Sequence, residues 1–420
     1  MFHRKGAALV AATALLGFAG IAQAAEPQQS IAPVAGLALD APKYLAENAP
    51  APADTSLMGM ANKAGFGKTL DSYGLTIGGW VQGGVTYNAR SVNVSEGRVF
   101  DFEVQDPTLH QVVVYVNKAV DAKLKTFQVG GRMEWMWGGD ARLIHANGLF
   151  DHYGLNDGPD EQFDLTQLYV DLYFGNIGNG LNIRAGKFVT LLGQETIDPN
   201  ANLFYSHSYL FGYAIPFTHT GAYATYALND AISIDAGFSR GWEQALEDNN
   251  GCAIDLFGRV SWAIDKNSSL KVTFIGGPEQ AGNNDDYRYV LDVIYSTKLG
   301  DNLSLVINAD YGWEENAAGD GGDASWCGVA GYLSYQINDM MAFNVRAEYF
   351  NDNDGARGLG TDTVYEVTVG LDIKPLLSNR NFASLRFRPE IRYDYSPDDF
   401  FAGGTKNDQW TAAIDVIFGF

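Results

Sequence analysis

Apolar and polar residues alternate along the C-terminal end of the chain, from Trp410 to Phe420. Every second residue in this segment is apolar, and the positions between them are small or polar except for Ile417. A period of two is that of a β-strand with one face toward an apolar medium and the other toward water. The apolar set is Trp410, Ala412, Ile414, Val416, Phe418 and Phe420, and it opposes Thr411, Ala413, Asp415 and Gly419.

The same alternation recurs in segments upstream. From residue 384 to residue 395, the even-numbered positions are polar or charged and the odd-numbered positions are apolar. Pro389 in the middle of this segment predicts a β-bulge, because proline cannot donate to a sheet ladder. Residues 303–313, 343–349 and 365–373 also alternate, and their apolar faces often end in aromatic residues. Aromatic girdles of this kind are typical of strands that cross a membrane.

Short turn signals alternate with longer, acidic connections along the chain. The short ones lie at residues 228–230, 264–267, 299–302 and 337–339, at nearly equal intervals. Strict alternation of tight turns and long loops is the arrangement of transmembrane barrels, and a Greek-key sandwich has no reason to keep it. The predicted fold class is therefore all-β: a transmembrane antiparallel β-barrel of about 16 strands, wide enough for an aqueous lumen. The strands are expected to start near residues 75, 108, 126, 164, 180, 218, 230, 252, 268, 286, 301, 324, 339, 362, 383 and 408.

The N-terminus carries the order of features found in secretory signal peptides. Arg4 and Lys5 precede an apolar run at residues 7–21, and residues 22–24 form a small-x-small cleavage site. The alternative, a buried N-terminal helix, does not account for this basic–apolar–small order. We therefore predict a signal peptide at residues 1–24 and export of the rest of the chain.

The exported part divides into two predicted regions. Residues 25–72 are rich in alanine and proline, which predicts a flexible periplasmic extension with a short helix within residues 56–72. Residues 73–420 form the predicted barrel domain. No stretch beyond the signal peptide approaches the roughly 18 uncharged apolar residues of a membrane-spanning helix.

Charge and cysteine content exclude several classes of function. The formal net charge is −22 and the pI is about 4.5, which argues against nucleic acid and against docking on anionic lipid through basic patches. Cys252 and Cys327 lie on predicted strands that are four apart, too far for a direct disulfide, whose Cα atoms lie within about 7 Å. They are expected to stay unpaired or to be bridged through adjacent loops. No His or Cys stands at metal-ligand spacing beside them, so no metal site and no cofactor is expected.

The longest predicted connection, residues 189–217, is rich in aromatic residues. A loop of this length is usually functional or disordered, and its aromatic side chains favour burial over disorder. We expect it to fold into the barrel and narrow the channel; the alternative is an extracellular cap over the mouth. The loop carries Glu195 and Asp198, with His207 and His219 near its end, and these are the candidate constriction residues.

Basic side chains on the predicted lumen faces form the other half of the candidate site. Closure of the barrel brings most of the strands that carry them into one arc. Acid on one side of a narrow passage and arginine on the other would set up a transverse field that favours polar solutes, and charged rings bias ion choice in pores. Alternatively, the arginines pair with Glu390 and Asp394 and only solvate the wall. The candidate wall residues are Arg132, Glu134, Arg184, Arg386, Arg388, Glu390 and Arg392.

A block of motifs lies in and around the long connection. Residues 184–188 read Arg-Ala-Gly-Lys-Phe, residues 193–195 read Gly-Gln-Glu, and residues 202–209 and 216–221 are rich in aromatic and small polar residues. This block resembles the signature of the OmpL-like outer-membrane β-barrel porin family, and the resemblance covers most of the chain from about Gly79. The resemblance implies a porin and does not name its solute.

Two further segments fit that family, whereas one position and one segment depart from it. Residues 138–142 and 241–243 fit. Gln194 stands where the family usually has an aromatic residue, and residues 211–215 also differ, so the lining of the constriction is expected to differ too. A last strand that ends on Phe420 is similar to the assembly signal of bacterial outer-membrane barrels.

Other functional classes have weaker support in the sequence. Residues 237–241 match G-x-S-x-G, but Ser239 continues a strand alternation and is not followed by the helix that a nucleophile elbow requires. The acidic segments 320–323 and 352–355 do not keep the spacing of a calcium-binding loop. An anchored adhesin would need a passenger domain, whereas the extension is linker-like.

The resulting hypothesis is a porin in the outer membrane of a Gram-negative bacterium, not an enzyme, for passive diffusion of small hydrophilic solutes and ions. Acidic outer loops should enrich cations at the mouth, which predicts mild cation selectivity. The open alternatives are a substrate-specific outer-membrane channel and a barrel-anchored surface protein or enzyme. Expected partners are outer-membrane lipid and lipopolysaccharide, the barrel-assembly machinery and small hydrophilic solutes, with no nucleic acid. A homotrimer is expected by analogy with other 16-stranded porins.

Overall fold

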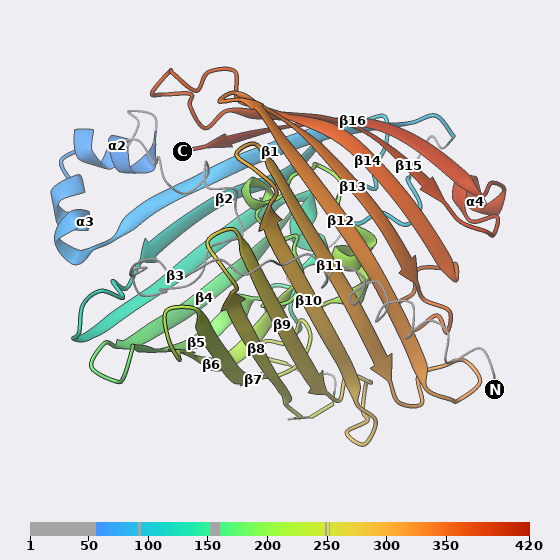
Figure 1. Ribbon diagram of the computed structural model, residues 1–420, viewed down its shortest axis with the longest axis horizontal. Coiled ribbons are helices and arrows are strands. Elements are labelled where there is room, and N and C mark those ends of the chain that lie inside the picture. The colour runs from blue at the N-terminus through green and yellow to red at the C-terminus, as the bar shows by residue number, and fades with distance from the viewer. Residues whose placement is uncertain (1–55, 91–93, 152–159, 248–249, 252) are drawn as a thin grey trace.

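Sixteen antiparallel strands close into a barrel in the computed structural model, which describes residues 56–90, 94–151, 160–247, 250–251 and 253–420 (Figure 1). Each strand pairs with its neighbours in the chain, and β1 pairs with β16 to close the ring. The predicted fold class is confirmed. The strands are β1 (Thr76–Asn88), β2 (Thr108–Lys118), β3 (Phe127–Gly138), β4 (Gln162–Phe174), β5 (Leu181–Val189), β6 (Thr218–Ala227), β7 (Ile232–Ser239), β8 (Asp255–Ala263), β9 (Ser268–Gly277), β10 (Arg288–Lys298), β11 (Leu303–Glu314), β12 (Ala324–Asn338), β13 (Met341–Asn351), β14 (Thr363–Ile373), β15 (Arg386–Tyr395) and β16 (Asp408–Gly419).

The strands lie close to their predicted positions, because each keeps the period of two over most of its length. Every strand starts within three residues of the position expected from the sequence. Asn229 builds the tight β6–β7 turn, where its Oδ1 accepts the N–H groups of Ala231 at 2.8 Å and Ile232 at 2.9 Å. Asp265 makes the equivalent bonds in the β8–β9 turn. The alternation of short and long connections is not strict, however, since the β14–β15 connection spans residues 374–385.

The apolar faces of the strands point outward and the polar faces point into the lumen. On β16, Trp410 and Ile414 are exposed while Thr411 and Asp415 are buried. Rings on the apolar faces also pair across neighbouring strands, and those of Tyr393 and Trp410 have centroids 4.7 Å apart. This arrangement suits a barrel that has lipid outside and polar groups inside.

Pro389 does not produce the predicted bulge. β14 pairs with β15 at Gly370 with Glu390 and again at Ile373 with Phe387, which is one continuous register, and the pairing with β16 is unbroken. Pairing with β14 is interrupted beside the proline, because Pro389 has no N–H to donate. β15 therefore keeps its even-numbered charged residues on the lumen side.

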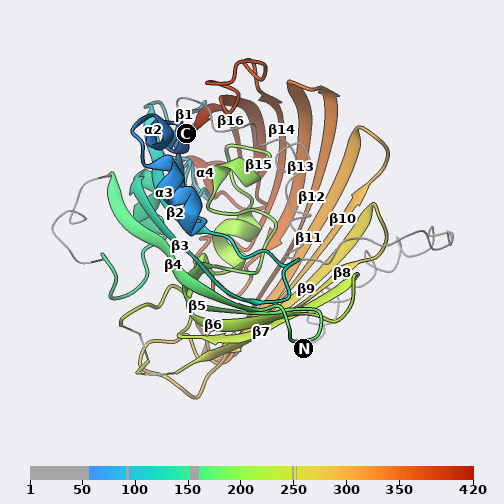
Figure 2. The same cartoon turned by 90° about the vertical axis from the view of Figure 1, so that its left-hand side faces the viewer.

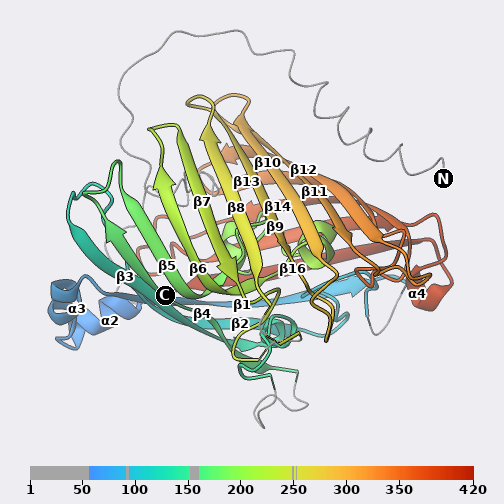
Figure 3. The same cartoon turned by 90° about the horizontal axis from the view of Figure 1, so that it is seen from below.

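Short helices lie at the two ends of the barrel (Figures 1 and 3). The helices α2 (Leu57–Lys63) and α3 (Gly67–Tyr73) stand at the end where the C-terminus lies, and α4 (Phe401–Gly404) stands at the opposite end. Residues 56–72 thus form two short helices, not one. Gly65 separates them with a left-handed φ of 85°, which glycine adopts without strain.

Several sequence-based predictions concern residues that the structure does not describe. The signal peptide at residues 1–24 and the first part of the extension, residues 25–55, lie outside the described residues, as does Cys252. Cys327 shares the outward face of β12 with Val329 and forms no disulfide. Within the described part of the chain, no helix has the length and apolarity needed to span a membrane.

The connection between β5 and β6 lies inside the ring of strands, where Figure 2 shows its coiled pieces in green. We call residues 190–217 the lumen loop; it contains the short turns η3 (Pro199–Ala201) and η4 (Leu210–Ala214). The outer loops on either side of it pair with each other: Asn147 N donates to Glu243 O at 2.7 Å. The Glu243 carboxylate in turn accepts the N–H of Thr218, where the lumen loop ends. These bonds close the rim at the point where the chain turns inward.

Candidate pore constriction

The lumen loop crosses the barrel instead of following one wall. It leaves β5 at Val189, and Gln194 N donates to Asn308 Oδ1 of β11 at 2.9 Å. Farther on, Asn202 O accepts hydrogen bonds from Arg386 and Arg388 of β15, each at 2.9 Å. The loop therefore passes from β5 to β11 and then to β15 before it returns to β6.

Carboxylates on the wall hold the loop by its main chain. Glu348 of β13 accepts the N–H groups of Tyr209 and Leu210, each at 2.7 Å. Glu390 of β15 accepts the N–H of Tyr205 at 2.8 Å and that of the following residue at 3.2 Å. Each of these two carboxyl groups accepts two neighbouring main-chain N–H groups, so the glutamates fix the path of the loop.

Arginines of β13 and β15 bind the carbonyl groups of the loop. Arg346 donates to Ser206 O at 2.8 Å, and Arg392 donates to His207 O at 2.6 Å. Wall carboxylates pair with the same side chains, as Asp394 does with Arg392 at 2.7 Å. The arginines of this wall are at most 2% exposed, because the loop covers them.

Because the loop covers these arginines, the predicted field between an acidic loop and an opposing arginine wall is wrong for β15. Arg386, Arg388 and Arg392 do point into the lumen, but they do not face the loop across an open passage. Arg392 does pair with Asp394, as the alternative expected, but it is fully buried and does not solvate the wall. Glu390 binds loop N–H groups instead of an arginine. The cause is the loop itself, which packs directly onto β13 to β15.

The two acids of the loop also have partners. Glu195 accepts Arg346 Nη1 and the N–H of Ser208, each at 2.7 Å. Burial alone would raise the pKa of Glu195, but the Arg346 guanidinium, His207 and the Ser208 N–H together outweigh burial and hold that pKa below its usual value. Asp198 caps η3 through Asn200 N at 2.9 Å, and burial raises its pKa. Both acids are therefore hydrogen-bonded, Glu195 to an arginine of the wall and Asp198 within the loop.

The two histidines have different surroundings. His207 Nε2 accepts a hydrogen bond from Asn202 Nδ2 at 3.1 Å and the ring stacks on Phe211, and burial lowers the pKa of His207. His219 lies 3.1 Å from the hydroxyl of Thr190 and 3.4 Å from that of Ser239. Among the described residues, no carboxylate binds His219, so the serine of the G-x-S-x-G match has no histidine–acid relay.

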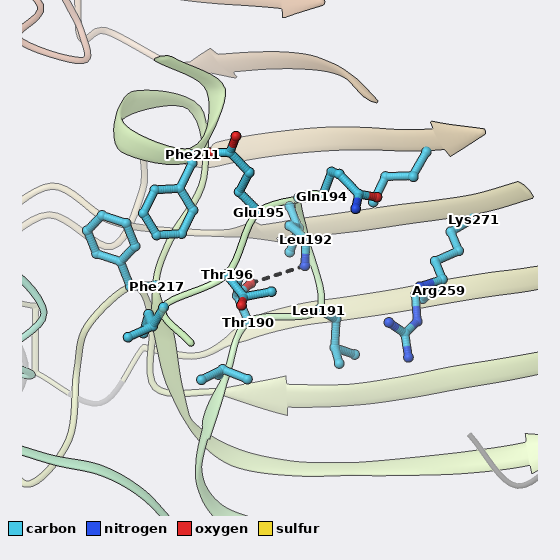
Figure 4. Close-up of a pocket in the computed structure, with 14 residues that line it drawn as sticks. Thr190, Leu191, Leu192, Gln194, Glu195, Thr196, Phe211, Phe217, Arg259 and Lys271 are labelled. Carbon is cyan, nitrogen blue, oxygen red and sulfur yellow. Dashed lines mark hydrogen bonds between the residues drawn. The ribbon is translucent and has the colours of Figure 1, made fainter. Parts of the chain in front are cut away.

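The open side of the loop faces β8, β9 and β10. A cavity of about 110 Å³ lies there, between residues 189–197 of the loop region and the side chains of Arg259, Lys271 and Ile294. Figure 4 shows Arg259 and Lys271 beside each other on the wall, opposite the start of the loop. Neither residue was predicted from the sequence as part of the site, although the alternation of β8 and β9 places both on the lumen face.

Three arginines, one each from β3, β5 and β8, are partly open to water. Arg132 donates to Glu134 at 2.8 Å, Arg184 to Asp171 at 2.9 Å, and Arg259 to Asp235 at 2.8 Å. The arginine side chains are 19%, 23% and 21% exposed, whereas their carboxylate partners are 4%, 10% and 2% exposed. Of the predicted wall residues, Arg132 and Arg184 are thus partly exposed to the lumen, and Glu134 is buried behind Arg132. In each pair, the guanidinium is the group that meets the lumen water.

The site holds no candidate metal centre. Across residues 56–420, apart from the segments left undescribed, no three His, Cys, Asp or Glu side chains gather in a way that could hold a metal ion. The site therefore consists of a fixed loop, a wall that anchors it, and an opposite wall with partly hydrated arginines.

A closed barrel with an outward apolar face and a charged lumen defines the class of outer-membrane channels. The chain belongs to the beta-barrel porin-2, OmpL-like family, whose model matches residues 74–420. This confirms the family resemblance found in the sequence. No curated protein sequence matches the chain.

Solved outer-membrane proteins share the fold at low identity. The outer membrane channel DcaP of Acinetobacter baumannii is 10% identical with a TM-score of 0.55, covering 82% of this chain and 97% of that one. OprB of Pseudomonas putida is 12% identical with a TM-score of 0.57, covering 86% and 97%. The trimer form of OmpT from Vibrio cholerae is 11% identical with a TM-score of 0.52, covering 82% and 99%.

Proposed function

We propose that this chain is a porin through which small hydrophilic solutes and ions diffuse passively across the outer membrane. The observation that carries the proposal is the closed 16-stranded barrel, crossed by a loop that is anchored to β13 and β15. The remaining side keeps Arg132, Arg184 and Arg259 partly in contact with water. Solutes would be sorted by size where the loop approaches β8 to β10.

The loop supports a static constriction, not a gate. Its carbonyl groups accept from buried arginines and its N–H groups donate to buried glutamates, so release of the loop would strip partners from both sets. Unpaired buried groups of this kind are costly. Glu195 and Asp198 then act within the proposed constriction by shaping the loop, through Arg346 and Asn200.

The mild cation selectivity expected from the sequence stays a prediction. Carboxylates of the outer loops support it, because they raise the cation concentration at the mouth. The partly hydrated arginines of the passage act in the opposite direction, and each of them is partly neutralised by its own carboxylate. We therefore propose a weak preference for cations that originates at the mouth.

A planar bilayer tests the proposed function. Purified full-length protein, refolded in detergent and added to the bilayer, is expected to give steady conductance steps without any added substrate. Under a salt gradient, the reversal potential is expected to have the sign of cation preference. A chain that inserts and yet gives no steps would overturn the proposal, and the barrel would then be an anchor or a substrate-gated channel.

We also propose the outer membrane as its location and a homotrimer as its assembly. The trimer is supported by analogy with other 16-stranded porins, and crosslinking of detergent-extracted protein tests it. Cleavage after Ala24, contact with lipopolysaccharide and use of the barrel-assembly machinery remain predictions of the same hypothesis. Mass spectrometry of the exported chain would give the cleavage position directly.

A further inference from the structure

Tyrosine and arginine alternate in one row on the lumen face of β2 to β6. The row consists of Tyr115, Arg132, Tyr169, Arg184 and Tyr223, one from each strand. Arg132 lies directly opposite Tyr169 in the β3–β4 ladder, and Arg184 lies directly opposite Tyr223 in the β5–β6 ladder. We call these five residues the tyrosine–arginine row.

The rings hold the guanidinium groups in place. Arg132 Cζ lies 4.0 Å from the ring centroid of Tyr115. Arg184 Cζ lies 3.7 Å from that of Tyr169 and 5.8 Å from that of Tyr223. These distances are within the reach of cation–π attraction, so each cation is oriented before any ligand arrives.

The carboxylates of the wall leave part of each guanidinium free. Asp171 accepts the Nε and Nη2 donors of Arg184 at 2.9 Å, and Glu134 accepts the Nε and Nη2 donors of Arg132. Neither Nη1 group has a carboxylate partner among the residues that the structure describes. The exposed surface of the row therefore offers N–H donors beside the half-buried rings of Tyr115 and Tyr169, with the carboxylates behind them, whereas Tyr223 is buried.

A ligand that fits this surface needs two features. A carboxylate matches the free edge of a guanidinium, and such pairs are stronger than neutral hydrogen bonds. A flat aromatic ring matches the tyrosines, since aromatic rings favour offset or edge-to-face contact. A neutral ring lacks the first feature and an aliphatic acid lacks the second.

We propose that the tyrosine–arginine row binds small aromatic carboxylates. The row serves as a binding site for such solutes along the passage, and this role rests on the proposed channel function. The binding itself does not depend on that function. The acidic mouth slows the approach of anions at low salt, so the row recognises the solute by short-range contacts and not by long-range attraction.

Isothermal titration calorimetry of the full-length protein in detergent measures ligand binding directly, so it tests the site without any transport. The probes are benzoate, cyclohexanecarboxylate and benzyl alcohol. Benzoate is expected to bind about two- to tenfold more tightly than cyclohexanecarboxylate, the range that an aromatic pair contributes. Benzyl alcohol is expected to bind more weakly than either acid.

Two variants and one matched control locate the site. Arg184→Gln is expected to weaken benzoate binding about 10- to 100-fold, as loss of a charged hydrogen bond does. Tyr169→Leu keeps an apolar side chain and is expected to bring benzoate and cyclohexanecarboxylate to equal affinity. Arg90→Gln is the control, because Arg90 pairs with Asp408 away from the row. Tyr169→Leu still decides the matter if Arg184→Gln fails to assemble.

The outcomes separate this site from the proposed channel. Equal affinity of the wild type for benzoate and cyclohexanecarboxylate would overturn the site, and so would benzoate binding that neither Arg184→Gln nor Tyr169→Leu weakens. Conductance steps in a bilayer without benzoate binding would support the proposed porin function and overturn the proposed binding site. Benzoate binding by a chain that gives no conductance steps would support the proposed binding site and overturn the proposed porin function.

Discussion

Charged side chains of β13 and β15 bind main-chain atoms of the lumen loop. Glu348 and Glu390 take its N–H groups, and Arg346 and Arg392 take its carbonyl groups. At the scale of single residues, each of these contacts is buried, so loss of one partner leaves the other without water to replace it. The charges of this wall thus act as structural groups.

The substitution Glu390→Ala tests this role. It leaves the N–H groups of Tyr205 and Ser206 without an acceptor, and each unsatisfied group costs about 1–3 kcal/mol. We expect a lower free energy of unfolding in urea and a noisier open-channel current. Glu161→Ala is the control, because Glu161 is exposed. Equal stability of the two variants would contradict the anchoring role.

The pH dependence of stability gives a second test, at Glu195. Burial raises its pKa, but Arg346, His207 and the Ser208 N–H together hold it below the usual value. A carboxylate with a lowered folded-state pKa stabilises the protein above its unfolded-state pKa of about 4.3, and this contribution is lost as the pH falls through the folded-state value. Glu195→Gln is therefore expected to lower the urea midpoint at pH 5–8, and the difference from wild type is expected to shrink toward pH 3.

His207 titrates in the same region, and its lowered pKa makes acid destabilise the loop as well. The charge of Glu195 acts on the pKa of His207, so the difference between wild type and Glu195→Gln reports the carboxylate together with its coupling to His207. A difference that stays constant down to pH 3 would contradict the ion pair with Arg346.

At the scale of elements, the strands were predictable and the cover of the lumen was not. The alternation of polar and apolar residues tells on which face of a strand each residue lies. It placed both Arg184 and Arg386 on the lumen face. Whether water reaches them depends on the path of the lumen loop, which exposes Arg184 and buries Arg386. That path is set by contacts more than a hundred residues apart, such as Gln194 with Asn308. Arg259 could have been found from the alternation of β8 alone.

The seam between β1 and β16 offers a test at this scale. Gly79 and Phe420 exchange main-chain hydrogen bonds at 2.9 and 3.0 Å. A Cβ at Gly79 would lie 2.0 Å from the carbonyl oxygen of Val113 and 2.7 Å from the Phe420 ring. Gly79→Ala is therefore expected to reduce the yield of closed barrel, measured as the fraction with heat-modifiable mobility on a gel.

The matched control for this seam is Gly331→Ala. Gly331 lies on the outward face of β12, where the nearest atom to an added Cβ is 4.0 Å away. We expect this variant to assemble like the wild type. Equal loss of closed barrel in both variants would show that the close approach at Gly79 is not what matters.

At the scale of the whole molecule, the outer loops and the passage differ in how their charges are arranged. The outer loops add to the net charge of −22, whereas the arginines of the passage each stand in front of a carboxylate. Charges at the mouth act over a Debye length, which is about 30 Å at 0.01 M salt and about 3 Å at 1 M. Paired charges inside the lumen are screened far less.

Ionic selectivity should therefore depend on salt. We expect cation preference at 0.01 M salt and little preference at 1 M, because screening removes the influence of the mouth. Reversal potentials measured across a fixed concentration ratio at several mean concentrations would show this trend. A preference that does not change with salt would place the selective charges in the passage.

The anchoring of the lumen loop has a consequence for how the protein can change over time. The wall recognises N–H and carbonyl groups, and almost every residue type carries both. Replacement of a side chain that points into the passage leaves those bonds intact. Mutations can therefore change the pore diameter and the chemistry of the lining during evolution, while the main-chain path of the loop is kept.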